Sequence, residues 1–91
     1  MVTIYAPYED RLLVVEGDGP WRSRTTLAGR RLEGVAATPG RAFVATFEGG
    51  LLRSADGESW EQVGPPGMPT SVTAVAVSPT DPDMVYAGTE P

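Results

Sequence analysis

Glycine and proline recur so closely along this chain that a substantial helix has nowhere to form. The 91 residues include 11 Gly and 9 Pro, and the longest stretches without either, Tyr8–Glu16 and Thr70–Ser78, are nine residues each. A helix typically needs about 8–20 residues with few such breakers. Because there are also no helices to make parallel crossovers, the strands are expected to pair antiparallel. The sequence therefore predicts an all-β fold.

The chain also contains an internal repeat. The segment Gly34–Pro39 (GVAATP) is similar to Ala74–Pro79 (AVAVSP), at an offset of 40 residues. Phe43–Thr46 is similar to Val85–Gly88 at an offset of 42, and the two extra residues fall in a polar turn. A period of about 40–45 residues with several strands per unit is typical of a β-propeller blade. The predicted fold class is therefore antiparallel, four-stranded β-propeller blades that form a partial propeller.

The repeat divides residues 1–91, a single partial β-propeller, into three units. Residues 1–31 are a degenerate first blade, 32–71 a complete blade and 72–91 the first half of a third. The expected strands are Val2–Ala6, Arg11–Glu16 and Trp21–Thr26 in the first unit, Leu32–Thr38, Arg41–Phe47, Gly50–Ser54 and Trp60–Val63 in the second, and Val72–Val77 and Met84–Gly88 in the third.

Two of these strands are apolar on both faces. Leu12–Val15 and Ala74–Val77 carry no polar residue, whereas a half-buried strand alternates apolar and polar side chains. We therefore expect both segments to be covered on both sides by neighbouring blades.

The stretch Ser54–Trp60 (SADGESW) has the composition of a tight hairpin turn. The Asp56 carboxylate is suited to accept the backbone N–H groups that follow it, and Ser54 offers a second local hydroxyl. Gly57 allows a positive φ, and Trp60 brings a large apolar surface to the return strand. An ordinary Asp-Gly β-turn is the simpler alternative. A calcium site or an acid/base pair made by Asp56 and Glu58 is a further one, although no other nearby oxygens would complete a calcium shell.

In this context, residues 32–91 resemble BNR/Asp-box repeat propellers, the WD40/YVTN/BNR-like proteins often described as glycosyl hydrolase-like or sialidase-like. The similarity rests on Ala45–Gly57 (ATFEGGLLRSADG), Val75–Pro79 (VAVSP) and Val85–Pro91 (VYAGTEP). Family members are usually whole propellers, so the resemblance implies an N-terminal fragment of about two and a half blades. It also implies that the Asp-box, here Ser54, Asp56, Gly57 and Trp60, is structural.

The resemblance assigns no catalytic residue. A sialidase site draws an Arg triad, a Tyr/Glu nucleophile pair and an acid/base Asp from several blades, and the Phe-Arg-Ile-Pro start of sialidases is absent. The expected function is a non-catalytic repeat module, structural or ligand-binding. The alternative is part of a glycoside hydrolase-like enzyme whose active site needs further blades.

Propeller geometry puts a ligand face on the side opposite the Asp-box turn. The residues expected there are Phe47, Glu48, Arg30, Arg31 and Glu90. The two arginines are suited to an anion, but a solvated charge pair is the simpler interpretation. Trp21 has the shape to stack on a sugar, although burial within the blade is favoured. Asp81–Asp83 is expected to be a hairpin turn rather than a metal site.

Composition narrows the chemistry further. The chain has neither Cys nor His, which removes disulfides, Cys/His zinc sites and a Ser-His-Asp triad. A net charge of −5 argues against nucleic-acid partners. No apolar run approaches the ~20 residues of a membrane span, and the N-terminus lacks signal-peptide features, so a cytoplasmic location is expected. No metal or cofactor is predicted. The expected partners are a carbohydrate or protein ligand, the remaining blades of a longer chain, or other copies joined through open blade edges.

Overall fold

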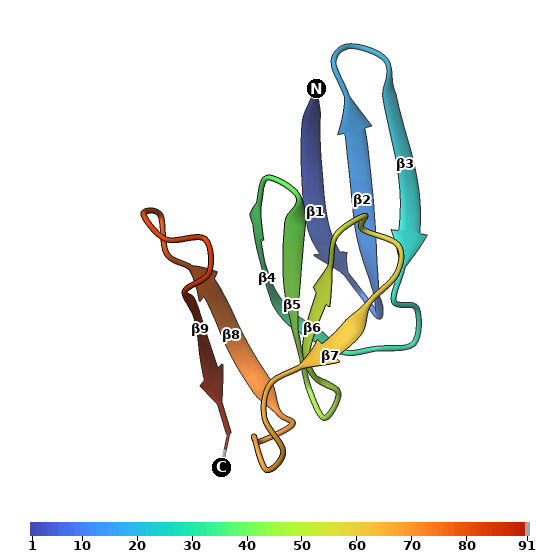
Figure 1. Ribbon diagram of the computed structural model, residues 1–91. Coiled ribbons are helices and arrows are strands. Elements are labelled where there is room, and N and C mark those ends of the chain that lie inside the picture. Colours follow the sequence, from blue (N-terminus) through green and yellow to red (C-terminus); the bar gives the residue numbers. More distant parts are fainter. Residues whose placement is uncertain (91) are drawn as a thin grey trace.

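The computed structural model describes residues 1–90 as nine β-strands joined by turns (Figure 1). The end of the third predicted unit, Pro91, lies outside the described residues. The strands are β1 (Val2–Tyr8), β2 (Arg11–Gly17), β3 (Trp21–Thr26), β4 (Leu32–Thr38), β5 (Arg41–Thr46), β6 (Gly50–Ser54), β7 (Glu61–Val63), β8 (Val72–Val77) and β9 (Val85–Thr89).

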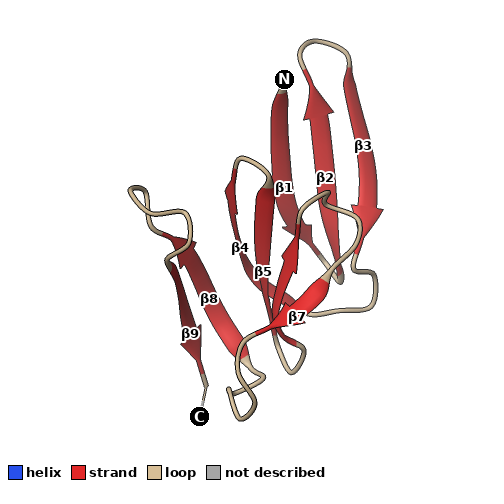
Figure 2. Cartoon of the chain, viewed as in Figure 1, coloured by secondary structure: helices blue, strands red, loops and turns tan. Residues whose placement is uncertain are grey.

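The strands form three separate antiparallel sheets in chain order (Figure 2). The first sheet has the order β1-β2-β3, the middle sheet β4-β5-β6-β7 and the last sheet β8-β9. Every pairing is antiparallel, and no helix occurs within residues 1–90. The prediction of an all-β, antiparallel fold is therefore confirmed.

Glycine at positive φ lies in two of the turns, and the sequence predicts this for Gly57. Gly40 (φ 80°) ends the β4–β5 hairpin, and Gly57 (φ 77°) lies in the β6–β7 connection. In the β5–β6 turn a left-handed residue is Glu48 (φ 71°), which is uncommon for a side chain other than glycine. That turn begins one residue earlier than expected, so Phe47 belongs to the turn and not to the strand.

The middle sheet is covered on both faces, because alternate residues of β5 enter two different cores. Phe43 and Ala45 pack with Leu51 and Val72, between the middle and last sheets. Val44 points the other way and packs with Leu12 and Val14 of β2, between the middle and first sheets. Two cores that share one strand hold the three sheets face to face.

The first and last sheets are covered on one face only, which corrects the expectation for their apolar strands. In β2, Leu12 and Val14 are buried whereas Leu13 and Val15 are partly exposed, and in β8, Ala74 and Ala76 are exposed. The physical reason is position. Each of these sheets has a neighbour on one side within residues 1–90, so only alternate residues can be covered.

The turns gather at two ends of the molecule. Figure 1 shows the β4–β5, β6–β7 and β8–β9 connections at the upper end of their sheets, and the β1–β2 and β5–β6 turns at the lower end, where the chain also finishes. Backbone hydrogen bonds tie the lower connections together, from Phe47 N to Arg31 O (3.0 Å), Gly50 N to Thr70 O (2.7 Å) and Glu90 N to Ser71 O (2.9 Å).

Candidate functional site

The Ser54–Trp60 turn is built on two side-chain acceptors. Asp56 Oδ1 accepts the backbone N–H groups of Glu58 and Ser59, each at 2.8 Å. The buried Ser54 Oγ accepts the N–H groups of Gly57 (2.8 Å) and Asp56 (3.2 Å) and donates to Asp56 Oδ1 at 3.0 Å. Sequence analysis predicted these local hydrogen bonds, and the structure contains them. They satisfy turn N–H groups that no strand partner reaches.

The first sheet holds this turn from the side. Arg24 of β3 donates from Nη2 to the carbonyl oxygen of Asp56 (3.1 Å), and its Nε lies 3.1 Å from a carboxylate oxygen of Glu58. Arg24 also pairs with Glu16 of β2, and this pair is the main reason that the pKa of Arg24 is raised. Arg24 was not among the residues predicted from the sequence, because nothing local to β3 indicates a contact 32 residues away.

Trp60 connects the turn to the core. Its ring packs against the cluster of Leu12, Val14 and Val44, between the first and middle sheets. The return strand β7 begins one residue later, at Glu61. Trp60 was expected to supply apolar surface to the return strand, and the structure shows that this surface joins two sheets.

Hydrogen bonds keep the Asp56 carboxyl ionised, so it is unsuited to act as a general acid near neutral pH. The hydrogen bonds from Ser59, then Glu58, then Ser54 lower the pKa of the Asp56 carboxyl below its ordinary value of 3.8. A general acid at neutral pH needs the opposite shift. Within residues 1–90, no group of three or more His, Cys, Asp and Glu side chains is arranged to hold a metal ion. Asp56 is therefore committed to the turn.

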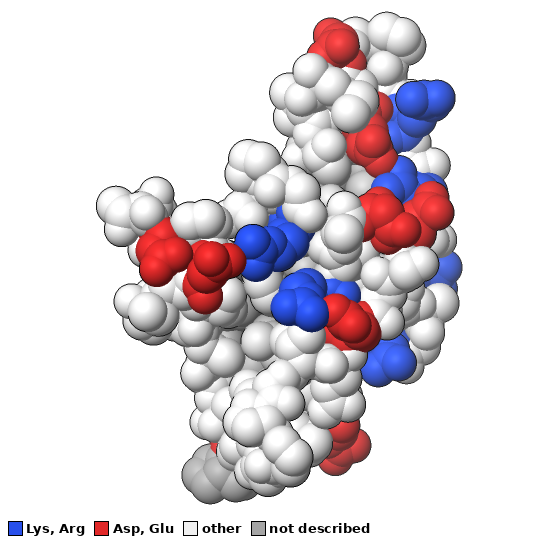
Figure 3. Space-filling model, in the orientation of Figure 1, with Lys and Arg blue, Asp and Glu red and all other residues white. Residues whose placement is uncertain are grey.

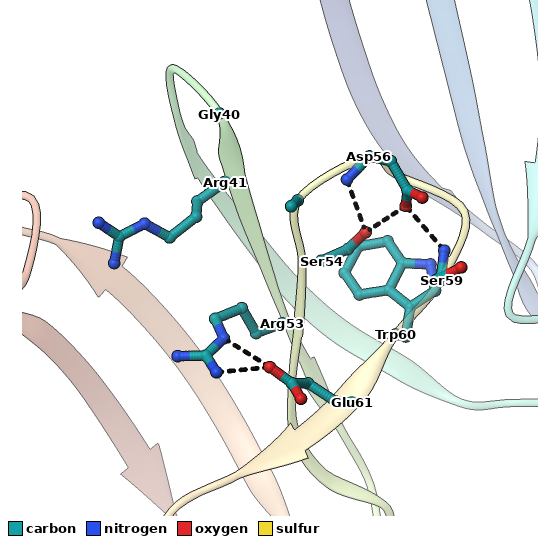
Figure 4. A pocket seen from close by; sticks show the side chains of 9 residues that line it. Gly40, Arg41, Arg53, Ser54, Asp56, Ser59, Trp60 and Glu61 are labelled. Atoms are coloured by element: carbon teal, nitrogen blue, oxygen red, sulfur yellow. Dashed lines mark hydrogen bonds and ion pairs between the residues drawn. The ribbon is translucent and has the colours of Figure 1, made fainter.

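A hollow of about 610 Å³ lies beside this turn, between β6, β7 and the β4–β5 hairpin (Figure 4). In it, Arg53 Nε donates to Glu61 Oε1 at 3.0 Å. Arg41 extends toward the last sheet, where its Nη2 lies 3.0 Å from Asp83 Oδ1. Figure 3 shows the same pattern over the face drawn, with positive and negative side chains next to one another. The lining residues are Gly40, Arg41, Arg53, Ser54, Ala55, Asp56, Ser59, Trp60 and Glu61.

Arg41, Arg53 and Glu61 were not among the site residues predicted from the sequence. A weak signal was available for the last two, because residues directly opposite on paired strands face the same side and Arg53 lies opposite Glu61. No such signal exists for Arg41, whose partner lies 42 residues away in another sheet.

The residues expected on the opposite face lie at the lower end of the sheets. The Arg31 guanidinium stacks over the Phe47 ring, 4.5 Å from its centroid, and its Nε lies 3.0 Å from Glu33 Oε1. A methyl group at Gly49 would lie 3.0 Å from Arg30 Nη1, which places Arg30 beside the same turn. The structure thus brings Arg30 and Arg31 to the turn that contains Phe47 and Glu48.

Glu90 is the fifth residue expected on that face. It is exposed, and its N–H donates to Ser71 O next to Thr70, whose carbonyl accepts Gly50 N. Glu90 comes directly after β9 and lies near the lower end of the middle sheet, close to the start of β6. A role for these residues in ligand binding stays a prediction.

Two further expectations have different outcomes. Asp81–Asp83 forms a hairpin turn, in which Asp83 N donates to Asp81 Oδ1 at 3.0 Å, as predicted. The favoured burial of Trp21 is wrong, because this side chain is 53% exposed. Trp21 lies on the uncovered face of the first sheet, so no neighbouring sheet within residues 1–90 buries it.

No protein-family model matches this chain, and neither a curated protein nor a solved structure gave a match. Among the described residues, no helix has the length and apolar character required to cross a membrane. The cytoplasmic location stays a prediction.

Proposed function

We propose that this chain is a non-catalytic β-propeller repeat module of the BNR/Asp-box type, with a structural or binding role. One observation carries the proposal. The three sheets stack face to face in chain order, and the first strand of the middle sheet, β4, contacts the first strands of both neighbours, β1 and β8. In a propeller, the first strand of each blade similarly lies next to those of the adjacent blades around a central channel.

The direction of the repeated side chains supports the same proposal. Val35 and Val75 are equivalent in the repeat, and each packs against the sheet that precedes its own. Consecutive units with the same orientation relative to their predecessors are what radial repetition of blades requires.

The chemistry of the hollow favours binding over turnover. Its two carboxylates belong to Asp56, which is held ionised by the turn, and Glu61, which is paired with Arg53. Glycoside hydrolysis typically needs one protonated carboxylic acid and one free carboxylate on either side of the bond. The turn occupies Asp56, and the Glu61 carboxylate is hydrogen-bonded to Arg53, so neither residue supplies the free pair of groups that the reaction needs.

The second candidate is a part of a glycoside hydrolase-like enzyme. The observation in its favour is the same hollow, in which an aromatic ring, Trp60, lies near the Arg53–Glu61 pair. Aromatic rings and ion-paired carboxylates are groups that bind sugars, and further blades would supply the missing acid.

Incubation with fluorogenic glycosides, sialosides included, separates the two candidates. The chain and its Glu61→Gln and Glu33→Gln variants are compared after identical purification. Glu33 is a matched control because it pairs with Arg31 as Glu61 pairs with Arg53, but lies outside the hollow. We expect no turnover above buffer. Turnover that Glu61→Gln abolishes and Glu33→Gln retains would overturn the proposal in favour of the enzyme.

A further inference from the structure

The first sheet leaves a wide apolar face uncovered. Residues that pair across its strands point to the same side, so Ile4 lies with Val15 and Ala6 with Leu13, on the face opposite to the buried Leu12 and Val14. Ile4 is 46% exposed. We call this the outer face of the first sheet, and its members are Val2, Ile4, Ala6, Leu13, Val15 and Trp21.

The last sheet leaves a second face uncovered, on the opposite side of the molecule. Ala74, Ala76 and Tyr86 point away from the core that contains Val72, Val75 and Val77, and form the outer face of the last sheet. Tyr86 is 60% exposed. Register adds Tyr8 and the charged Arg11 at the β1–β2 turn end of the first outer face, so the centre of each outer face is apolar and the charge lies at the rim, as in an interface.

Strand register indicates which kind of surface fits the outer face of the last sheet. In the middle sheet, Phe43 pairs with Ala36 and is buried against the sheet that follows. In the last sheet, Tyr86 pairs with Ala76, the repeat equivalent of Ala36. Tyr86 therefore occupies the position of Phe43, at an offset of 43 and not the 42 that sequence similarity indicated, but no following sheet covers it within residues 1–90. Its natural cover is another sheet of the same kind.

We propose that this cover is the outer face of the first sheet of a second copy. The inference rests on the proposed function, since it treats the three sheets as consecutive blades. Each chain has one uncovered face that looks forward along the blade order and one that looks backward, so a second copy supplies the face that each lacks. The side chains of Ala74 and Ala76 are small. They leave space that Ile4, Val15 and Trp21 of the second copy would fill.

Two copies joined in this way close upon themselves. Each contributes three sheets, of three, four and two strands, and two identical head-to-tail contacts produce a ring of six sheets, a number within the range of about four to eight found for propeller blades. A ring of three copies would have nine sheets and falls outside that range. The expected partner is thus a second copy, and the expected assembly is a two-fold symmetric dimer.

Light scattering after gel filtration and sedimentation equilibrium over a concentration series test the assembly. We expect a species of about 19 kDa, twice the chain mass of 9.6 kDa. Ile4→Lys and Tyr86→Glu should each weaken dimerisation by at least about tenfold, as expected for residues at the centre of an interface. Ser59→Lys and Ser59→Glu are matched controls, because they place the same charges on an exposed side chain outside both outer faces.

Mixing the two variants distinguishes this arrangement from symmetric pairing of like faces. A mixed dimer has one unaltered contact and one in which the Ile4→Lys substitution of one copy faces the Tyr86→Glu substitution of the other. These opposite charges attract, so the mixture should recover the dimeric species. If only one of the two substitutions dissociates the dimer, or if mixing the variants does not restore the dimeric species, the head-to-tail arrangement would be overturned. A monomeric wild type that still melts cooperatively by circular dichroism would overturn the inference and leave the proposed function standing.

Circular dichroism of each variant tests whether the substitution has unfolded the chain. Both substituted side chains are largely exposed, so the melting profiles of the monomeric variants should match those of the Ser59 controls. Should Tyr86→Glu or Ile4→Lys unfold, the milder Tyr86→Ser and Ile4→Ser take their places with the same expected loss of dimer.

Discussion

Phe43 and Tyr86 occupy equivalent positions in two sheets, but truncation to alanine should destabilise the fold far more at Phe43 than at Tyr86. Phe43 is 4% exposed and packs the last sheet onto the middle one, whereas the equivalent ring of Tyr86 is mostly in solvent. Truncation of a buried Phe to Ala costs about 3–5 kcal/mol, because transfer free energy is lost and a cavity remains. Truncation of an exposed residue on a sheet costs under about 1 kcal/mol.

These costs are large relative to the whole stability of such a chain. At roughly 0.05–0.15 kcal/mol per residue, 91 residues give about 5–14 kcal/mol, so Phe43→Ala should remove about a fifth or more of it. With a urea slope of about 1–2 kcal/mol per molar, the unfolding midpoint should fall by about 1.5–5 M. Tyr86→Ala should leave the midpoint of the monomer within about 1 M of the wild-type value.

Urea titration followed by circular dichroism measures both midpoints, at protein concentrations where the wild-type midpoint no longer depends on concentration. Phe43→Leu is a useful control, because it keeps most of the buried volume and should cost under about 1.5 kcal/mol. A loss in Phe43→Ala as small as that in Tyr86→Ala would refute the reasoning, since it would mean that the last sheet does not pack on the middle sheet in solution.

Three further predictions concern the turn. Ser54→Ala removes a buried acceptor of two backbone N–H groups, so thermal unfolding should show a loss of about 1–3 kcal/mol; an unchanged melting temperature would contradict a structural role. Because the folded-state pKa of Asp56 is lowered, its contribution to stability is full above its ordinary pKa of 3.8 and is lost as the pH falls through the lower folded value. Asp56→Asn should therefore flatten the dependence of stability on pH below 3.8, and equal slopes for the two proteins would be the contrary result. Gly57→Ala and Gly40→Ala should each lose about 1–2 kcal/mol at positive φ, with Gly57→Ala the greater because its methyl group would also meet the guanidinium of Arg24 at 3.0 Å; calorimetry that ranks them in reverse would count against this account.

The strands and turns were predictable because their causes are local. Gly40 tolerates the left-handed conformation that its hairpin needs, and Asp56 accepts hydrogen bonds from residues two and three positions further on. Both causes are visible within a few residues of sequence. The β5–β6 turn was placed less well because Glu48 is left-handed there as well as Gly50, and a glutamate gives no signal for where Phe47 leaves the strand.

The stacking of the sheets was only partly predictable, because its causes lie far apart in the chain. The contacts from Arg24 to Asp56 and from Arg41 to Asp83 span 32 and 42 residues and exist only once the sheets have packed. The exposure of Trp21 has the same origin. Its apolar ring favoured burial, but burial also requires a neighbour on that face, and neighbours cannot be read from a single strand.

The contrast between β5 and its counterparts β2 and β8 shows what the apolar patterns do and do not encode. All three strands are apolar on both faces, yet only β5 is buried on both, because only the middle sheet has two neighbours within residues 1–90. The apolar pattern of a strand therefore indicates how many of its faces are suited to burial, and the structure shows how many of them a neighbouring sheet covers. Where the two differ, at Leu13 and Val15 and at Ala74 and Ala76, the difference marks a surface whose composition fits another sheet. Amide hydrogen exchange of β2 and β8 measures this directly. If a second copy covers these faces, protection should rise toward that of β5 as the protein concentration increases, while β5 itself should change little.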